Sequence, residues 1–188
     1  MKRVFIVHQW NGSPQTDWYP WLKSQLEAKG FEVHVPAMPD SAAPNMKKWI
    51  SFLKKSVKNP DVETFFVGHS IGCQTIVRYL SSLKTQVGGA VFVAGWFKLT
   101  GLGEEEKAIA QPWIEIEINF SKAKQNMGKS VAIFSDNDPY VPMINMKMFK
   151  SELESEIILE GHKGHFTQDD SVTELPIALE SLIKMAGM

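Results

Sequence analysis

The sequence contains a single cysteine, Cys73, so its 188 residues cannot form an internal disulfide bond. It also lacks the C-x-x-C pairs that bind structural zinc, and it has neither a glycine-rich phosphate loop nor a dinucleotide-binding fingerprint. We therefore expect no metal and no other cofactor. A lone cysteine is typical of proteins from reducing compartments, and this favours a cytoplasmic location.

Neither sign of charge is in excess, because 20 basic residues stand against 21 acidic ones and give a formal net charge of -1. A chain without a strong positive field has little to attract a nucleic acid or an anionic membrane. The sequence also has no run that approaches the roughly 18 apolar residues needed to cross a bilayer. The first apolar stretch, Val4–Val7, is too short for a signal peptide. We expect a soluble protein with neither nucleic acid nor membrane as a partner.

Short apolar runs recur along the chain and predict six strands. Most of these runs are continuous rather than alternating in hydrophobicity, which indicates burial on both faces of a sheet. Stretches with helical spacing separate most of them, as in parallel β-α-β units. We expect an α/β fold, a three-layer α/β/α sandwich around a mostly parallel six-stranded sheet, as a single domain over residues 1–188. The predicted strands are Val4–Val7, Phe31–Val35, Thr64–Val67, Ala90–Ala94, Val131–Ser135 and Glu156–Leu159.

The predicted helices follow apolar stripes with the same spacing. The first carries Trp18, Trp21, Leu22 and Leu26 on one face, with Asp17 in position to cap its start and with Gly30 beyond its end. Three more are predicted over Ile71–Leu83, Pro142–Leu153 and Val172–Met185.

Residues 97–127, between the fourth and fifth predicted strands, are too many for a simple crossover. Gly101, Gly103 and Pro112 interrupt any long helix there. We expect a small cap-like excursion that includes a helix near Phe120–Met127. Because it leaves the carboxyl end of a strand, where open α/β sheets bind ligands, the excursion can shape a site.

Gly68-His69-Ser70-Ile71-Gly72 follows the third predicted strand and leads directly into a helix. A G-x-S-x-G sequence in this context is the pattern of a nucleophile elbow, a turn so tight that only glycine fits beside the serine. The hydroxyl of Ser70 is then exposed at the edge of the sheet, where it can attack an acyl carbon.

A serine nucleophile needs a base, and the base needs an acid to hold its tautomer. His165 is the favoured base, because Gly164 would let its loop approach the serine closely, and His162 is the alternative. Asp138 is the favoured acid, because it lies deeper in the loop after the fifth strand than the alternative, Asp136. The order Ser70, Asp138, His165 is that of the α/β-hydrolase plan.

The oxyanion that forms during attack needs preorganised hydrogen-bond donors. One is expected from the backbone N–H of Ile71, which follows the nucleophile at the start of a helix. The second is expected from the loop after the first strand, where the N–H of either Gln9 or Trp10 could donate.

These residues resemble the small serine hydrolases of the retinoblastoma-binding protein 9 and YdeN type, within the α/β-hydrolase superfamily. The likeness spans nearly the whole chain. It implies a compact hydrolase core, carboxylesterase-like activity and a triad at Ser70, Asp138 and His165. Where related hydrolases often have His-Gly after the first strand, this chain has His8-Gln9. The motifs that carry the likeness are His8, Asp17-Trp18-Tyr19-Pro20-Trp21-Leu22, Gly68-His69-Ser70-Ile71-Gly72, Asp138-Pro139-Tyr140-Val141-Pro142 and Gly164-His165-Phe166.

Two tryptophans, Trp96 and Trp113, are candidates for the wall of an acyl pocket, although both could equally fill the core. The leading hypothesis is a serine hydrolase that cleaves small-molecule carboxylic esters through an acyl-enzyme, with thioesters and amides left open as substrates. The alternatives are an acyltransferase and a protein-interaction module built on a hydrolase fold.

Overall fold

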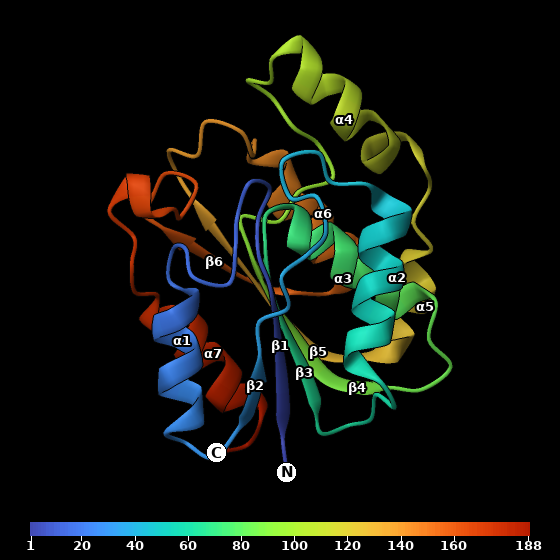
Figure 1. Ribbon diagram of the computed structural model, residues 1–188, viewed down its shortest axis with the longest axis vertical. Helices are drawn as coiled ribbons and strands as arrows, with labels where there is room; N and C mark the ends of the chain where they lie inside the picture. Colours follow the sequence, from blue (N-terminus) through green and yellow to red (C-terminus); the bar gives the residue numbers. More distant parts are fainter.

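The computed structural model describes all 188 residues, and Figure 1 shows a central twisted sheet between two layers of helices. The strand order is β2-β1-β3-β4-β5-β6, and every neighbouring pair is parallel. The predicted α/β fold with a mostly parallel six-stranded sheet is therefore confirmed. The strands are β1 (Arg3–Val7), β2 (Glu32–His34), β3 (Thr64–His69), β4 (Val87–Val93), β5 (Met127–Ser135) and β6 (Glu156–Glu160).

Helices cover both faces of the sheet. α1 and α7 contact each other in one layer, while α2, α3, α5 and α6 pack in series in the other. α4 lies at the end of the molecule toward which the strands run (Figure 1). The helices are α1 (Tyr19–Glu27), α2 (Met46–Val57), α3 (Ile71–Ser81), α4 (Glu104–Glu115), α5 (Phe120–Asn126), α6 (Ile144–Leu153) and α7 (Pro176–Met185), with a short 3₁₀ turn at Gln168–Asp170. None of these helices has the length and apolar character that crossing a membrane requires.

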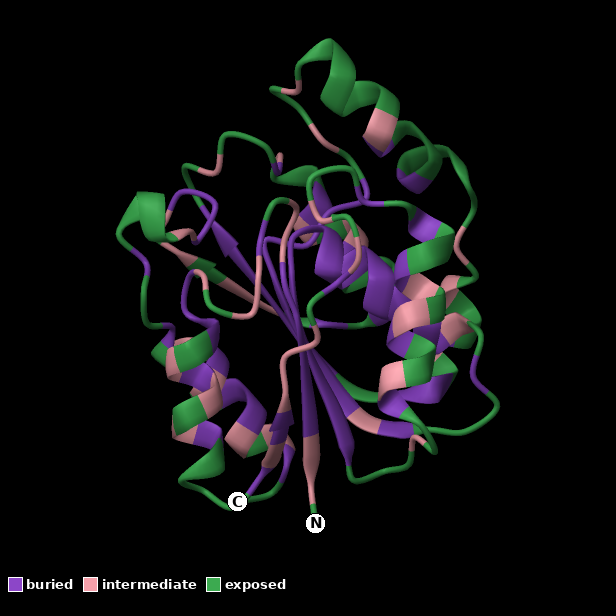
Figure 2. Ribbon diagram, viewed as in Figure 1, coloured by how far each residue is buried: buried purple, intermediate pink, exposed green.

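The core is concentrated around the strand and helix that carry the elbow. Every residue of β3 is buried, and so are the ten residues from Ile71 to Leu80 of α3 (Figure 2). The large aromatic side chains of Trp49, Phe66 and Phe92 are buried in the same cluster of hydrophobic residues. A turn anchored between two such elements has little freedom to move.

Two helices differ from the expectations. α2 was not predicted, although the Asn45 side chain caps it by accepting from the Lys48 N–H, and its buried Trp49, Leu53 and Val57 lie on one stripe. α4 continues through Pro112, which the sequence suggested would interrupt it. Pro112 lies on the exposed side of the helix, near its end, and Ile116 N–H still bonds to its carbonyl.

Asp17 is not the N-cap of α1, contrary to the expectation. Trp18 occupies the cap position and makes no side-chain capping bond, while Asp17 has a left-handed backbone with φ of 54°. Its carboxylate instead accepts from the Gln9 side chain at 2.8 Å and from the Gln168 N–H at 2.9 Å. Partners that are distant in sequence thus displace the local capping bond.

Candidate active site

Ser70 lies at the junction of β3 and α3 with backbone angles of φ 54° and ψ −118°, which are strained for a residue other than glycine. Its N–H donates to the Val93 carbonyl of β4 at 2.9 Å, which ties the turn to the sheet. A Cβ atom at Gly72 would overlap the Val7 carbonyl oxygen, and one at Gly68 would lie 2.8 Å from the Cys73 nitrogen. Both glycines are therefore needed for the tight turn.

His165 and Asp138 form a direct pair at the same edge of the sheet. Nδ1 of His165 lies 2.8 Å from Oδ2 of Asp138, and the two side chains are 9% and 2% exposed. The other carboxylate oxygen, Oδ1, accepts from the backbone N–H groups of Tyr140 and Val141 at 2.9 and 3.0 Å. Asp138 therefore holds the proton of the imidazole on Nδ1 and leaves Nε2 as an acceptor.

The alternative residues, Asp136 and His162, lie elsewhere in the same two loops. Oδ1 of Asp136 accepts from the His162 N–H at 2.7 Å, and the His162 side chain is 88% exposed. Neither lines the cavity that contains Ser70. Their bond joins the loop after β5 to the loop after β6.

Two further polar side chains, which the sequence reasoning missed, hold these loops together. Oδ1 of Asn137 accepts from the Gly164 N–H at 2.8 Å, and Oγ of Ser135 accepts from the Lys163 N–H at 2.9 Å. Together with Asp136, they place a continuous row of acceptors under the chain that leads to His165. The sequence signal was the run from Ser135 to Asp138, in which each side chain can accept a hydrogen bond.

From the sequence, Gly164 was expected to let its loop approach Ser70 closely, but the structure gives a different reason for a glycine at this position. It has a positive φ of 53°, and a Cβ atom there would overlap the carboxylate of Asp170. That carboxylate accepts from the His165 N–H at 2.9 Å. The glycine allows Asp170 to reach the backbone of the histidine.

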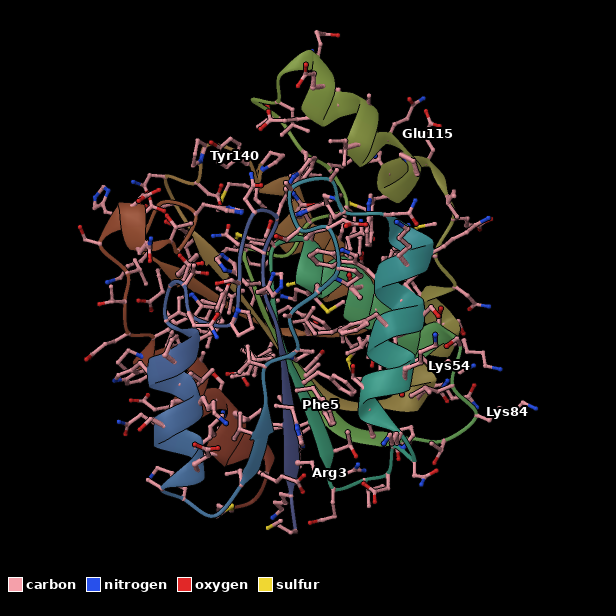
Figure 3. The ribbon with its side chains drawn as sticks, in the orientation of Figure 1. Arg3, Phe5, Lys54, Lys84, Glu115 and Tyr140 are labelled. Atoms are coloured by element: carbon pink, nitrogen blue, oxygen red, sulfur yellow. The ribbon has the colours of Figure 1, made fainter.

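Ser70 and His165 line one cavity of about 380 Å³ at the carboxyl edge of the sheet. Its apolar wall is formed by Trp10, Trp96, Leu99, Leu102 and Tyr140, and its polar rim includes Glu106 and Asp169. Figure 3 shows Tyr140 near α4, at the opposite end of the molecule from Arg3 at the start of β1.

The two candidate pocket tryptophans have different locations. Trp96 lines the cavity, and its indole N–H donates to Oγ of Ser70 at 3.3 Å. Trp113 does not line it. The helical spacing of α4 turns Trp113 toward α2, where its ring packs against Trp49 and its indole N–H donates to the Pro44 carbonyl at 3.1 Å. Trp113 is therefore a core residue, and the expectation that it walls the pocket is corrected.

The Ser70 hydroxyl is bonded to the indole of Trp96 and makes no hydrogen bond to the His165 ring in this structure. Because the oxygen accepts from the indole, its own proton remains available for transfer. Bonds between a nucleophile and its base are often looser without substrate than in the reacting complex.

The expected oxyanion donors differ in whether their N–H groups already have an acceptor within the protein. Ile71 is the first residue of α3, so its N–H has no partner within the helix. The Gln9 N–H donates to the Tyr19 hydroxyl at 3.1 Å, whereas the Trp10 N–H has no acceptor within the protein. This difference favours Trp10 over Gln9 as the second donor.

Two buried groups beside the elbow, His69 and Tyr19, were not assigned a role from the sequence. Nδ1 of His69 lies 2.6 Å from the Tyr19 hydroxyl, and Nε2 lies 2.7 Å from the His165 carbonyl oxygen. Burial lowers the pKa of His69 well below its usual value and raises the pKa of Tyr19 well above its own. Both side chains are therefore neutral at physiological pH.

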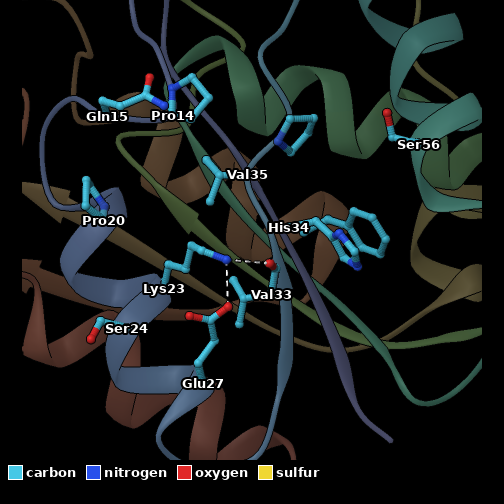
Figure 4. A pocket seen from close by; sticks show the side chains of 12 residues that line it. Pro14, Gln15, Pro20, Lys23, Ser24, Glu27, Val33, His34, Val35 and Ser56 are labelled. Carbon is cyan, nitrogen blue, oxygen red and sulfur yellow. Dashed lines mark hydrogen bonds and ion pairs between the residues drawn. The ribbon is translucent and has the colours of Figure 1, made fainter.

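A larger hollow of about 720 Å³ follows the edge strand β2, away from Ser70. Figure 4 shows Lys23 of α1 reaching across it to the Val33 carbonyl and to Glu27, at 3.0 and 2.6 Å. His34 on its rim is paired with Glu32 at 2.8 Å. These groups cover the unpaired edge of the sheet and bring no nucleophile and base together.

The structure contains no group of three or more histidine, cysteine, aspartate or glutamate side chains arranged to hold a metal ion. Cys73 is buried three positions after Ser70, and its thiol lies 3.4 Å from the Val93 carbonyl oxygen. Burial raises the pKa of this thiol, which keeps it protonated and unreactive.

Comparison with known proteins places this geometry in a family. The chain matches the model of the serine hydrolase family over residues 4–184. It is 29% identical to YdeN of Bacillus subtilis, over 96% of this chain and 94% of YdeN, and 26% identical to the serine hydrolase RBBP9 of Rattus norvegicus, over 98% and 97%.

Solved structures agree with this placement. The YdeN crystal structure superposes with a TM-score of 0.91, covers all of both chains and is 26% identical in sequence. A carboxylesterase of Nitrososphaera gargenis shares the fold with a TM-score of 0.74 at 16% identity, over 99% of this chain and 91% of its own. The resemblance inferred from the motifs is confirmed, and the chain belongs to the serine hydrolase family within the α/β-hydrolase superfamily.

Proposed function

We propose that the protein is an esterase-like serine hydrolase in which Ser70 is the nucleophile, His165 the base and Asp138 the acid that orients it. The observation that carries this proposal is the shared cavity. Ser70 and His165 line it together, and the His165 ring is held from behind by Asp138 at 2.8 Å. These groups supply the parts that acyl transfer requires.

The reaction begins when Oγ of Ser70 turns from the Trp96 indole toward Nε2 of His165 and gives up its proton. The oxygen then attacks the carbonyl carbon of the ester, and the imidazolium is stabilised by the Asp138 carboxylate. The N–H groups of Ile71 and Trp10 hold the negative charge that develops on the carbonyl oxygen. His165 next protonates the departing alcohol, which leaves an acyl group on Ser70.

Water completes the cycle by the same path in reverse. His165 takes a proton from the water, the resulting hydroxide attacks the acyl carbon, and the proton returns to Ser70 as the carboxylic acid leaves. The apolar wall formed by Trp10, Trp96 and Leu102 favours an uncharged acyl group of short or medium length.

The proposal is tested with p-nitrophenyl esters from acetate to palmitate, assayed on the wild-type protein and on Ser70→Ala. We expect the largest kcat/KM with short or medium chains, because the cavity is about 380 Å³. Ser70→Ala should lose at least about 10³-fold in kcat. A folded wild-type protein that is no faster than Ser70→Ala on every ester would refute esterase activity.

A further inference from the structure

The segment Asp17-Trp18-Tyr19 lies between the two loops that frame the elbow, and the triad gives it no role. Asp17 binds the Gln9 side chain on one side and the Gln168 N–H on the other. Trp18 donates its indole N–H to the Phe166 carbonyl at 3.1 Å in a buried contact. These three residues therefore touch both the oxyanion loop (residues 8–13) and the histidine loop (residues 161–168).

Tyr19 and His69 also connect the two loops, through a buried series of hydrogen bonds. Which atom donates in each bond can be worked out from the groups that can only accept. The His165 carbonyl can only accept, so Nε2 of His69 must carry the proton of that 2.7 Å bond. Nδ1 is then unprotonated and accepts from the Tyr19 hydroxyl at 2.6 Å. The oxygen of Tyr19 in turn accepts from the Gln9 N–H.

The surroundings keep the side chains of His69 and Tyr19 neutral, and this fixes which atoms donate and which accept along the series of hydrogen bonds. The His69 ring is fully buried between Trp18 and His165, with ring centres 5.4 Å from each. Burial lowers the pKa of His69, so it does not take a second proton that would oppose the Tyr19 O–H. The series runs without a break from Gln9 N–H to the His165 carbonyl.

This series of hydrogen bonds determines which backbone N–H of the oxyanion loop is left without an acceptor in the protein. The Gln9 N–H points to Tyr19 and is satisfied there, and the Gln9 side chain is held by Asp17. The next amide, that of Trp10, has no acceptor in the protein, and Trp10 lines the cavity with Ser70. The left-handed backbone of Asp17, with φ of 54°, is a strained conformation that these bonds maintain.

We infer that Tyr19 and His69 are positioning residues that fix the oxyanion loop to the backbone of the catalytic histidine, so that the Trp10 N–H is presented to the oxyanion. Asp17 supports the same arrangement through the Gln9 side chain and the Gln168 N–H. The inference rests on the proposed hydrolase function, and it adds residues that touch no substrate.

The first test is kinetic and uses Tyr19→Phe, which removes only the hydroxyl. Loss of a positioned oxyanion donor slows catalysis by about 10²-fold, so we expect kcat to fall on the order of 10- to 100-fold. KM should stay within about twofold, because the donor acts mainly in the transition state. Affinity for a trifluoromethyl ketone, which forms a tetrahedral adduct, should fall by about the same factor as kcat/KM.

The matched control is Tyr79→Phe. Tyr79 is 1% exposed, packs against Phe66 with ring centres 5.8 Å apart and makes no side-chain hydrogen bond within the protein. It should retain wild-type kcat. Asp17→Asn serves as a second variant, because an amide can replace only one of the two carboxylate acceptors, and it should lower kcat in the same direction. Unchanged kcat in a folded Tyr19→Phe, or a loss of kcat without loss of ketone affinity, would overturn the inference.

A second measurement does not depend on activity. Hydrogen exchange of individual amides should show Gln9 protected in the wild-type protein and at least about tenfold faster in Tyr19→Phe, with no change in Tyr79→Phe. A Gln9 amide that exchanges equally fast in wild type and Tyr19→Phe would contradict the series of hydrogen bonds even if the protein hydrolyses esters. If the Gln9 amide is protected from exchange but the protein does not hydrolyse esters, the series of hydrogen bonds is supported and the proposed function is refuted.

Discussion

Asp138 divides its two carboxylate oxygens between the backbone and the imidazole. Oδ1 accepts from Tyr140 and Val141 N–H, and Oδ2 accepts from His165. An amide in its place would keep its oxygen on the two backbone donors and turn its NH₂ group toward Nδ1. The imidazole would then be driven to carry its proton on Nε2, where it cannot act as a base.

Asp138→Asn is therefore expected to lower kcat by about 10³- to 10⁴-fold, with little change in melting temperature. The matched control is Asp136→Asn, two residues earlier, whose carboxylate bonds the His162 N–H and lies outside the cavity. It should retain activity within a fewfold. Equal losses in the two variants would show that general disruption of the loop, rather than the tautomer, explains the effect.

The meeting of three candidate side chains at one edge of the sheet was predictable from the sequence, while their catalytic roles stay a prediction. Ser70, Asp138 and His165 each follow a strand, and parallel strands bring such positions to one edge. Tyr19 and His69 were not found, because their bonds join residues 50 and 96 positions apart in sequence. No periodicity or spacing encodes a contact of that kind.

At the scale of elements, two side chains of the buried helix α3, Arg78 and Gln74, bond to carbonyl groups at the end of α4. Nη2 of Arg78 donates to the Trp113 and Ile116 carbonyls at 2.7 Å each, and Nε donates to Oε1 of Gln74 at 3.1 Å. Burial lowers the pKa of Arg78 to about 10, so it remains charged at neutral pH. A cation at the end of a helix also interacts favourably with the helix dipole.

Arg78→Ala should reduce the free energy of unfolding by about 3 kcal/mol, because it removes two hydrogen bonds from a charged donor. The Ile116 carbonyl then loses the guanidinium donor, and the Trp113 carbonyl keeps only the Gln74 side chain at 3.3 Å. For a chain of this size the melting temperature should fall by roughly 6–12 °C. Lys54→Ala on the exposed face of α2 is the control and should change little. A melting temperature of Arg78→Ala within about 2 °C of wild type would argue against this anchor.

Patterns of apolar residues located most elements but not all of them. The six strands lie where the continuous apolar runs predicted them, with ends that differ by up to four residues. α2 carries several lysines, yet it folds because Trp49 and Leu53 are buried against the core. The direction of Trp113 depended on how α4 packs, which local sequence does not determine.

For the whole molecule, two buried histidines link stability to pH. Nε2 of His8 accepts from the Met38 N–H at 3.0 Å, and Nδ1 of His69 accepts from Tyr19. Burial lowers the pKa of each below the usual 6.5. Below that value the unfolded chain binds protons at these positions and the folded protein does not, so the free energy of unfolding decreases as pH falls.

Above pH 6.5 we expect these histidines to leave the free energy of unfolding undiminished. As the pH falls below 6.5, the free energy of unfolding should decrease. Each of these two histidines contributes a slope of up to about 1.4 kcal/mol per pH unit. Urea denaturation at pH 7.5, 6.0 and 5.0 measures this slope. His8→Asn should reduce it, whereas His162→Gln, with a side chain 88% exposed in the parent, should leave it unchanged. Stability that is constant or rises over this range would contradict buried neutral histidines.

The measurement that most directly tests the central claim is covalent labelling by a fluorophosphonate. These reagents react with a serine that an adjacent base activates, so the intact mass of the wild-type protein should increase by one adduct. Peptide mapping should place the adduct on Ser70, and Ser70→Ala should remain unmodified. A folded wild-type protein that stays unlabelled, or an adduct on any other residue, would contradict the account.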